Sequence, residues 1–428
     1  MINGADRLVA KDIVRVLYAP HKVFKDIIQK PGYLGPLILL IIFVLAQVGS
    51  SYVIGSRSYL EQTMPVGDEG DALTENAALW LANSGVAISN NNVDYINGTP
   101  AFVGFPDYYG NSSVEFAVSN SSTLQMALND FGSQVDCGDN GFTEVFFRVK
   151  IVTPDAMPEN VTITLYSLPD SFFYYDLTSA FSSSVVNVWN NISVPVGSGD
   201  WLSNGNPSWG NITGLQLEFA WSSDSDIDLR LDGLFFKGNF QTQIELVGGI
   251  LPFLANSAVN GFAPFLFEWL LLTGLMYLLI KGLKGNVIWR PLMVAVGYAL
   301  VILVIQAIII AAVYSTLPDL YYQLEILAYV SGEFEVSYEV LFNQIANVST
   351  AGYIIQAVAW VWIVALGTFI TRAITGDKKI AEQLSIGKVA SGTTVSSEVT
   401  EFSWMKCLLV SGASLFLTII ILGLLGIA

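Results

Sequence analysis

The sequence contains little charge, one histidine and two cysteines. Charged residues make up 13% of its 428 residues, whereas soluble globular chains carry about a quarter. Mean hydropathy is +0.54. The histidine is His21, and the cysteines are Cys137 and Cys407. This inventory excludes a single soluble domain and leaves little for His/Cys metal sites or histidine-based catalysis.

Positive charge is also scarce. Lys and Arg total 19 against 36 Asp and Glu, a net charge of −17. Nucleic-acid binding needs clustered basic residues, so we expect no nucleic-acid partner. The sequence has no Walker loop, no Gly-x-Ser-x-Gly and no His-Glu-x-x-His, motifs that place catalytic groups in known structural contexts. We therefore expect a chain that is not an enzyme and requires no cofactor.

Long apolar stretches are the main positive feature. About 20 helical residues cross the roughly 30 Å hydrocarbon core of a bilayer. Five stretches reach this length, which predicts an α-helical membrane bundle: 34–54, 262–280, 292–314, 353–374 and 404–427. A signal peptide is the alternative for the first stretch. Because the 33-residue leader before it is too long for the usual basic region of a signal peptide, we interpret it as an uncleaved anchor.

The placement of basic residues predicts the orientation. Of the 19, 14 lie in leader 1–33, between the second and third helices, or in linker 375–403 and its borders. Because the chain crosses the membrane once with each helix, these three segments lie on the same side of the membrane. The positive-inside rule makes that side cytoplasmic. The leader is amphipathic and is expected at the membrane interface or packed on the bundle. Within the linker, residues 385–400 are rich in Ser, Thr, Gly and Val and are expected to be mobile.

Residues 55–240, between the first two helices, have a different pattern and fall outside in this topology. Val145, Phe147 and Val149 alternate with Phe146 and Arg148, which predicts half-buried antiparallel strands. Turn residues at regular spacing favour an extracellular all-β sandwich. We expect a helix at 75–84 and strands at 113–118, 124–128, 143–151, 161–167, 185–188, 191–195, 213–221 and 227–236. Segments 241–261 and 315–352 are expected at the outer membrane interface.

The external segments are acidic and contain every glycosylation sequon. Residues 56–261 hold 23 acidic and 5 basic residues. Seven Asn-x-Ser/Thr sequons occur, and each would be a surface site if used: Asn97, Asn111, Asn120, Asn160, Asn191, Asn211 and Asn347. We expect some of them to carry glycans. Cys137 has no partner cysteine on this side, a usage more typical of a prokaryotic, archaeal-like cell surface than of a secretory lumen.

The end of the outer domain resembles a galactose-binding-like jelly roll. The resemblance covers Trp189–Val196, Trp201, Pro207–Ile212, Leu215–Phe219 and Ile227–Phe236. It implies a carbohydrate-binding-module-like fold in which Trp209 and Trp221 pack in the core. It also implies a structural calcium ion near Asp232, for which Asp226 and Asp228 are the nearest further ligands; a solvated acidic strand end is the alternative. For glycan contact we expect exposed aromatic residues, namely Tyr108, Tyr109 and Trp201.

The helical part resembles the Yip family of five-helix membrane proteins. The resemblance lies in Pro20-x-x-x-Phe24, Pro31-x-x-x-x-Pro36, the turn Lys281–Gly285 and Gly297-Tyr298. It covers residues 1–54 and 262–428, and the β domain is an insertion relative to that family. Eukaryotic members are linked to Rab GTPases and vesicle traffic. The resemblance therefore implies a role in membrane organisation or trafficking.

Four polar residues inside the predicted spans are candidate functional groups, because such residues are costly in hydrocarbon. They are Glu268, Gln47, Gln306 and Gln356. A hydrogen bond between helices is the simpler interpretation of each. A transport or channel component that uses Glu268 and the acidic outer face is the functional alternative.

Together these patterns favour a non-enzymatic integral protein of the plasma membrane with a glycosylated domain outside. Its expected partners are the lipid bilayer and either surface glycans or another membrane or surface protein. The alternatives are the transport component, the Yip-like role and a hydrolase in the outer domain. The last is disfavoured because no paired-carboxylate arrangement is evident.

Overall fold

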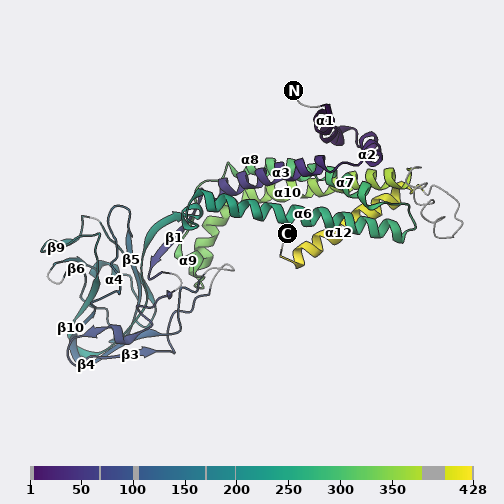
Figure 1. Cartoon of the computed structure of the whole chain (residues 1–428). Coiled ribbons are helices and arrows are strands. Elements are labelled where there is room, and N and C mark those ends of the chain that lie inside the picture. The colour runs from purple at the N-terminus through teal and green to yellow at the C-terminus, as the bar shows by residue number, and fades with distance from the viewer. Residues whose placement is uncertain are drawn as a thin grey trace. The chain divides into compact units, whose positions relative to one another are not determined.

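The computed structural model describes residues 4–66, 69–99, 106–168, 171–197, 199–377 and 401–426. It divides into two compact units (Figure 1). The helical unit comprises Met1–Arg57, Gln243–Pro318 and Gln344–Ala428, and the β unit comprises Ser58–Thr242 and Asp319–Asn343. The β unit therefore interrupts the helical unit twice along the chain.

The helical unit is built from α1 (Gly4–Tyr18), α2 (Pro20–Gln29), α3 (Leu34–Gly55), α5 (Gln243–Leu246), α6 (Ile250–Gly282), α7 (Trp289–Ala299), α8 (Val301–Tyr314), α10 (Glu333–Thr375, which begins in the β unit) and α12 (Trp404–Leu424). Among the described residues, five segments are helical, long and apolar enough to cross a membrane: α3, α6, α7 with α8, α10 and α12. These are the five helices that the sequence predicted.

Two helices are longer than predicted. The second begins at Ile250, so most of the expected interfacial segment 241–261 belongs to α6. The fourth begins at Glu333, so much of the expected outer loop 315–352 belongs to α10. Hydropathy identifies the apolar part of a helix but does not show at which residue the helix begins. Here the starts follow Gly249 and Gly332, whose φ angles of +106° and +89° favour glycine. Residues 378–400 of the predicted linker lie outside the described residues.

The leader packs on the helical core. Helix α2 buries Val23, Phe24, Ile27 and Ile28, and these side chains join the cluster that fills the helical unit. An amphipathic helix is stabilised mainly by burial of its apolar face. The packed alternative for the leader is therefore the one that the structure favours.

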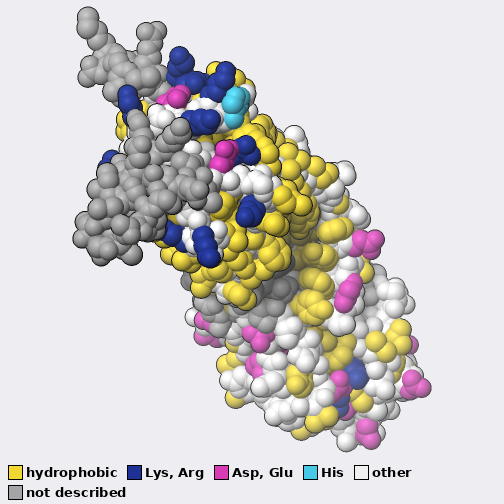
Figure 2. All heavy atoms as spheres, turned by 90° about the vertical axis from the view of Figure 1, so that its right-hand side faces the viewer, with side chains coloured by type: hydrophobic (Ala, Val, Ile, Leu, Met, Phe, Trp, Pro, Cys, Tyr) yellow, Lys and Arg dark blue, Asp and Glu magenta, His cyan; other side chains and the backbone are white. Residues whose placement is uncertain are grey.

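The three basic segments meet at one end of the helical unit. Arg290 donates to the carbonyl of Pro31 at 3.3 Å, and Arg372 pairs with Glu401 at 2.8 Å. Arg372 also lines a hollow together with Lys25 of the leader. Figure 2 shows Lys and Arg side chains gathered there beside a belt of hydrophobic side chains. This arrangement agrees with the predicted antiparallel threading.

The β unit is a large, mainly antiparallel sheet. Its strands are β1 (Ser58–Met64), β2 (Leu81–Ala82), β3 (Ala87–Asn91), β4 (Ser113–Leu128), β5 (Glu144–Thr153), β6 (Asn160–Leu168), β7 (Ser171–Asp176), β8 (Asn190–Pro195), β9 (Leu202–Asn204), β10 (Gly214–Thr242) and β11 (Leu320–Tyr322). Short helices η2 (Ala77–Leu79), α4 (Thr178–Phe181) and α9 (Leu324–Leu327) accompany them. Among the described strands, the one parallel pairing joins β1 to β11.

Strand β10 connects the sheet. Its first part pairs with β6 and β4, its middle part with β5 and β4, and its last part with β1. One face of each main strand contributes to a single buried cluster; Val149 of β5, Ile163 of β6 and Leu229 of β10 are examples. The sheet thus covers a main core, as the period-two alternation predicted. A smaller buried cluster, which includes Tyr109, Phe146 and Phe235, forms separately in the same unit.

Most predicted strands are confirmed; the corrections concern the limits of two strands, one false strand and one false helix. Segments 113–118 and 124–128 are one strand, β4, and segments 213–221 and 227–236 are one strand, β10. The strand at 185–188 is wrong, because a turn with Asn187 at φ +60° occupies it. The helix at 75–84 is also wrong. Only the turn η2 forms, and the Asn76 side chain caps it by accepting from the N–H of Ala78 at 3.1 Å.

Candidate functional site

An open pocket of about 440 Å³ lies on the β unit. The half-buried indole of Trp189 lines it together with amides, hydroxyls and one carboxylate, contributed by Asn190, Asn191, Ser183, Ser184, Ser331 and Glu333. Trp189 and Asn190 stand at the start of β8, and Glu333 begins α10. The pocket therefore combines one aromatic face with several groups able to donate or accept hydrogen bonds.

Trp189 is held in place by Asp94. The indole Nε1–H donates to the carboxylate of Asp94 at 3.2 Å. Asp94 in turn pairs with Lys150 at 2.7 Å and with Arg230. Burial alone would raise the pKa of Asp94, but its hydrogen bonds to Lys150 and Arg230 hold that pKa below its usual value. The ionised carboxylate of Asp94 thus fixes the indole ring of Trp189. Less side-chain entropy of Trp189 is then lost when a ligand binds.

Glu333 is fixed from inside the sheet. Arg148 of β5 has 1% of its side chain exposed and pairs with Glu333 at 2.6 Å. Asn191 donates its amide to the same carboxylate at 2.7 Å. Arg148 also donates to the hydroxyl of Tyr109. Although burial alone would lower the pKa of Arg148, Tyr109 and Glu333 raise it above its usual range, so the guanidinium stays charged.

Gly233 makes room for this arginine. Its φ is +57°, and a Cβ atom there would lie 2.8 Å from Nη1 of Arg148. Any side chain would therefore meet both a strained backbone and a steric clash. The Asp232-Gly233 step lies at a register shift of β10 against β5, and the glycine there leaves space for the arginine.

The predicted glycan-contact residues are buried. Tyr108, Tyr109 and Trp201 expose 7%, 3% and 7% of their surface, so the prediction that they are exposed is wrong. Tyr109 packs edge-on against Phe235, and Trp201 donates its indole N–H to the carbonyl of Pro195 at 2.7 Å. Trp221 is buried, and Trp209 stacks on Phe173 with ring centroids 3.8 Å apart. The core assignment is confirmed for Trp221, whereas Trp209 is partly buried and packs against the edge of the core.

The three predicted calcium ligands do not gather. Asp226 accepts from the N–H of Asn120, and Asp228 lies 3.9 Å from Arg230. Among the described residues no group of three or more His, Cys, Asp or Glu side chains is placed to hold a metal ion. Calcium takes six to eight oxygen ligands. The described residues therefore do not form the site that the sequence suggested.

Asp232 instead pairs with Asp71. Burial raises the pKa of Asp71 to about 6, and it raises that of Asp232 as well. Backbone N–H groups of Ile96 and Gly233 donate to Asp232 at 2.6 and 2.8 Å, and that of Gly110 donates to Asp71 at 2.9 Å. Because hydrogen-bond donors already occupy these oxygens, the pair suits a shared proton better than a metal ion.

The sequons differ in accessibility. Asn97, Asn111, Asn120, Asn160 and Asn191 are exposed on the β unit. Asn211 is half-buried, and its Oδ1 is enclosed. Asn347 is exposed but lies within helix α10. Exposure thus separates these positions into groups that the sequons alone do not distinguish.

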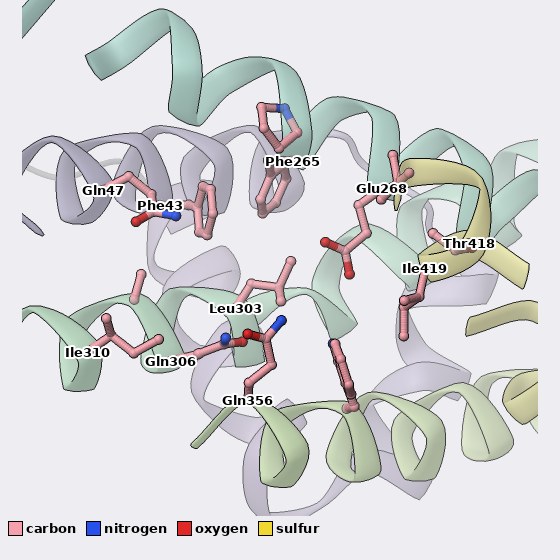
Figure 3. Close-up of a pocket in the computed structure, with 14 residues that line it drawn as sticks. Phe43, Gln47, Phe265, Glu268, Leu303, Gln306, Ile310, Gln356, Thr418 and Ile419 are labelled. Carbon is pink, nitrogen blue, oxygen red and sulfur yellow. The ribbon is translucent and has the colours of Figure 1, made fainter. Parts of the chain in front are cut away.

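The four polar residues predicted inside the membrane spans come together. A cavity of about 240 Å³ in the helical unit is lined by Gln47, Glu268, Gln306 and Gln356. They stand on α3, α6, α8 and α10 respectively, and Thr418 of α12 completes the lining. Figure 3 shows the Glu268 carboxylate and the amides of Gln306 and Gln356 pointing into the same space. The sequence identified these residues singly and gave no sign that they share one site.

Sequence reasoning missed the pocket on the β unit. Trp189 was noted only as one tryptophan of the jelly-roll pattern, while Glu333 was assigned to an interfacial loop. No sequence signal connects them, because the two residues are 144 positions apart and meet only through the fold. A Trp-Asn-Asn run before a strand is the one local hint.

No protein-family model matches this chain, and no curated protein matches it. Membership of the Yip family therefore stays a prediction. Among solved structures, a family 11 carbohydrate-binding module from Clostridium thermocellum is similar at 13% identity and TM-score 0.26, over 41% of this chain and 94% of the module. A family 30 module from a cellulosomal cellulase of the same organism is similar at 11% identity and TM-score 0.23, over 38% and 98%.

A third module, solved in complex with β-1,4-galactotriose, is similar at 11% identity and TM-score 0.24, over 40% of this chain and 95% of the module. At these identities the comparisons concern the fold alone. The neighbours are carbohydrate-binding-module-like β-sandwiches.

Proposed function

We propose that this chain is an integral membrane protein whose β unit binds carbohydrate outside the cell. Membrane insertion is supported by the outer faces of the apolar helices. Ile41, Leu45, Leu278, Val361 and Phe416 each expose at least 60% of their surface. Apolar surface of this extent is unstable in water and stable in lipid.

The orientation in this proposal follows from charge. The end of the helical unit that collects Lys and Arg would face the cytoplasm. The β unit, a jelly roll inserted between the first and second spans, would then face outward, as would the C-terminal end of α12. Its acidic surface would keep it soluble and repel other acidic surfaces.

The pocket of Trp189 is the observation that carries the carbohydrate proposal. Small-ligand sites pair apolar or aromatic walls with a few fixed polar groups. Here the indole of Trp189 would provide the aromatic surface on which the apolar side of a sugar ring packs. Asn190, Asn191 and Glu333 offer amide and carboxylate groups to the hydroxyls. The site is open, which suits the binding of one or a few sugar residues of a surface polymer. The proposed role of the chain is binding and not catalysis.

A glycan array probed with the purified full chain in detergent tests the proposal. We expect binding by the wild type and loss of binding by Trp189→Ala. Tyr174→Ala is the matched control, because Tyr174 is an exposed aromatic residue of the β unit outside the pocket. Equal binding by the wild type and Trp189→Ala would place the sugar elsewhere. Absence of binding to every glycan by a correctly folded wild type would reject carbohydrate recognition.

A further inference from the structure

The cavity in the helical unit contains one uncompensated acidic group. Glu268 is the sole charged side chain among its lining residues, and no lysine, arginine or histidine lines it. Within the described residues the structure gives Glu268 neither an ion pair nor a hydrogen bond. A carboxylate enclosed by helices is costly unless a positive charge or a proton accompanies it.

The remaining polar lining is able to accept hydrogen bonds. The Oε1 atom of Gln306 is buried and has no partner. Thr418 donates its hydroxyl hydrogen to the carbonyl of Ser414 at 2.8 Å, so its oxygen retains a free lone pair toward a ligand. An unsatisfied buried acceptor destabilises the folded chain. A ligand that carries N–H groups or positive charge would satisfy these atoms.

Aromatic side chains form part of the cavity wall, beside aliphatic ones such as Leu303 and Ile310. Phe43 and Phe265 lie with their ring centroids 5.0 Å apart, and Trp360 lines the cavity from α10. Aromatic faces attract organic cations, and the attraction grows when water is excluded. A bare metal ion would need several oxygens at about 2.0–2.6 Å, whereas the space of about 240 Å³ is far wider than such a shell.

We propose that this cavity binds a small organic cation of the ammonium class, with Glu268 as its counter-charge. Gln306 and Gln356 would accept hydrogen bonds from it or from its substituents, and the aromatic part of the wall would contact its alkyl groups (Figure 3). This proposal is independent of carbohydrate binding by the β unit.

Choline and its neutral isostere 3,3-dimethylbutan-1-ol provide the test. The full chain is placed in phosphatidylglycerol nanodiscs, and binding is measured by isothermal titration calorimetry. We expect binding of choline and no binding of the isostere. Glu268→Gln should weaken choline binding about tenfold or more, equivalent to about 1.4 kcal/mol. Glu339→Gln is the matched control, because it removes the same charge from an exposed position outside the cavity.

Trp360→Leu is a second test that does not depend on correct folding of the Glu268 variant. It retains the carboxylate and removes one aromatic ring from the cavity. It should weaken choline binding several-fold while gel filtration shows an unchanged particle. Equal binding of the isostere, unchanged binding in both variants, or absence of choline binding by the wild type would overturn the proposal. A weaker choline response in phosphatidylcholine nanodiscs would identify a lipid headgroup as the source of the ammonium group, and an equal response would identify a free amine.

Discussion

Arg148, almost completely buried in the β unit, forms its ion pair with Glu333, which follows it by 185 positions in the sequence. This pair joins strand β5 to the segment Asp319–Asn343, which returns to the β unit after helices α6, α7 and α8. It also fixes one wall of the Trp189 pocket. Loss of the pair should therefore affect both stability and binding.

Glu333→Gln should destabilise the β unit by about 3 kcal/mol, because it leaves a buried guanidinium without its counter-charge. Hydrogen exchange of peptides from β5 and β10, measured by mass spectrometry on the full chain, reports this locally. The exposed Glu339→Gln serves as control and should leave exchange unchanged. Unaltered protection in Glu333→Gln would show that solvent or another group compensates Arg148.

The Asp71–Asp232 pair should make stability depend on pH. The pKa of Asp71 is raised by burial from 3.8 to about 6, so the unfolded chain loses this proton at lower pH than the folded chain. The free energy of unfolding should therefore fall as pH rises between these values, by about 3 kcal/mol at most. Asp71→Asn removes the titrating group.

Urea unfolding of the wild type and Asp71→Asn at several pH values checks this sign. The variant should gain stability relative to the wild type as pH rises from about 4 to 6, and the difference should then level off. A difference that is constant with pH, or that favours the wild type at high pH, would contradict a buried shared proton.

Glycan occupancy should follow exposure. If the β unit is glycosylated, Asn97, Asn111, Asn120 and Asn160 should carry glycans, whereas half-buried Asn211 and helical Asn347 should not. A glycan on Asn191 would fill the Trp189 pocket, so we expect this sequon to be unoccupied in protein that binds external sugar. Mass spectrometry of glycopeptides from native membranes measures each site. Ser193→Ala removes this sequon but retains Asn191 and should leave sugar binding unchanged.

The orientation is open to cysteine labelling. Both native cysteines are buried, and burial raises the pKa of the Cys137 thiol to about 12, so background reaction with a maleimide should be low. In intact cells, an impermeant maleimide should label Ser223→Cys of the β unit. It should label Lys284→Cys, in the turn after α6, only after the membrane is permeabilised. The reverse pattern would invert the proposed topology.

The sequence predicted those features that depend on local composition. Apolar runs gave the five helices, and alternation at Val145, Phe147 and Val149 gave the strands that line the core. Turns were harder to predict than strands. The local sequence of Val185–Val188 is compatible with a strand, and only the left-handed conformation of Asn187 in the structure shows that the chain turns there. Helix starts at Ile250 and Glu333 were missed because hydropathy does not report them.

The candidate sites were predicted unevenly for a related reason. Gln47, Glu268, Gln306 and Gln356 each stood out as polar residues in apolar helices, but their common cavity depends on how five helices rotate about their axes. Tyr108 and Tyr109 stand beside proline and glycine and looked exposed, yet tertiary packing buries them. Exposure of an aromatic side chain is a property of the whole fold rather than of its neighbours in sequence.

The long strand β10 and the late segment Asp319–Asn343 constrain how this protein can be made. β10 supplies partners to β1, β4, β5 and β6, so the ribosome must pass Thr242 before the sheet can close. The remaining piece of that unit emerges only after α6, α7 and α8 have been synthesised. Strands of the β unit therefore remain unpaired for part of translation, and pairings between residues distant in sequence form slowly. Aggregation competes most strongly with folding of the β unit during this interval.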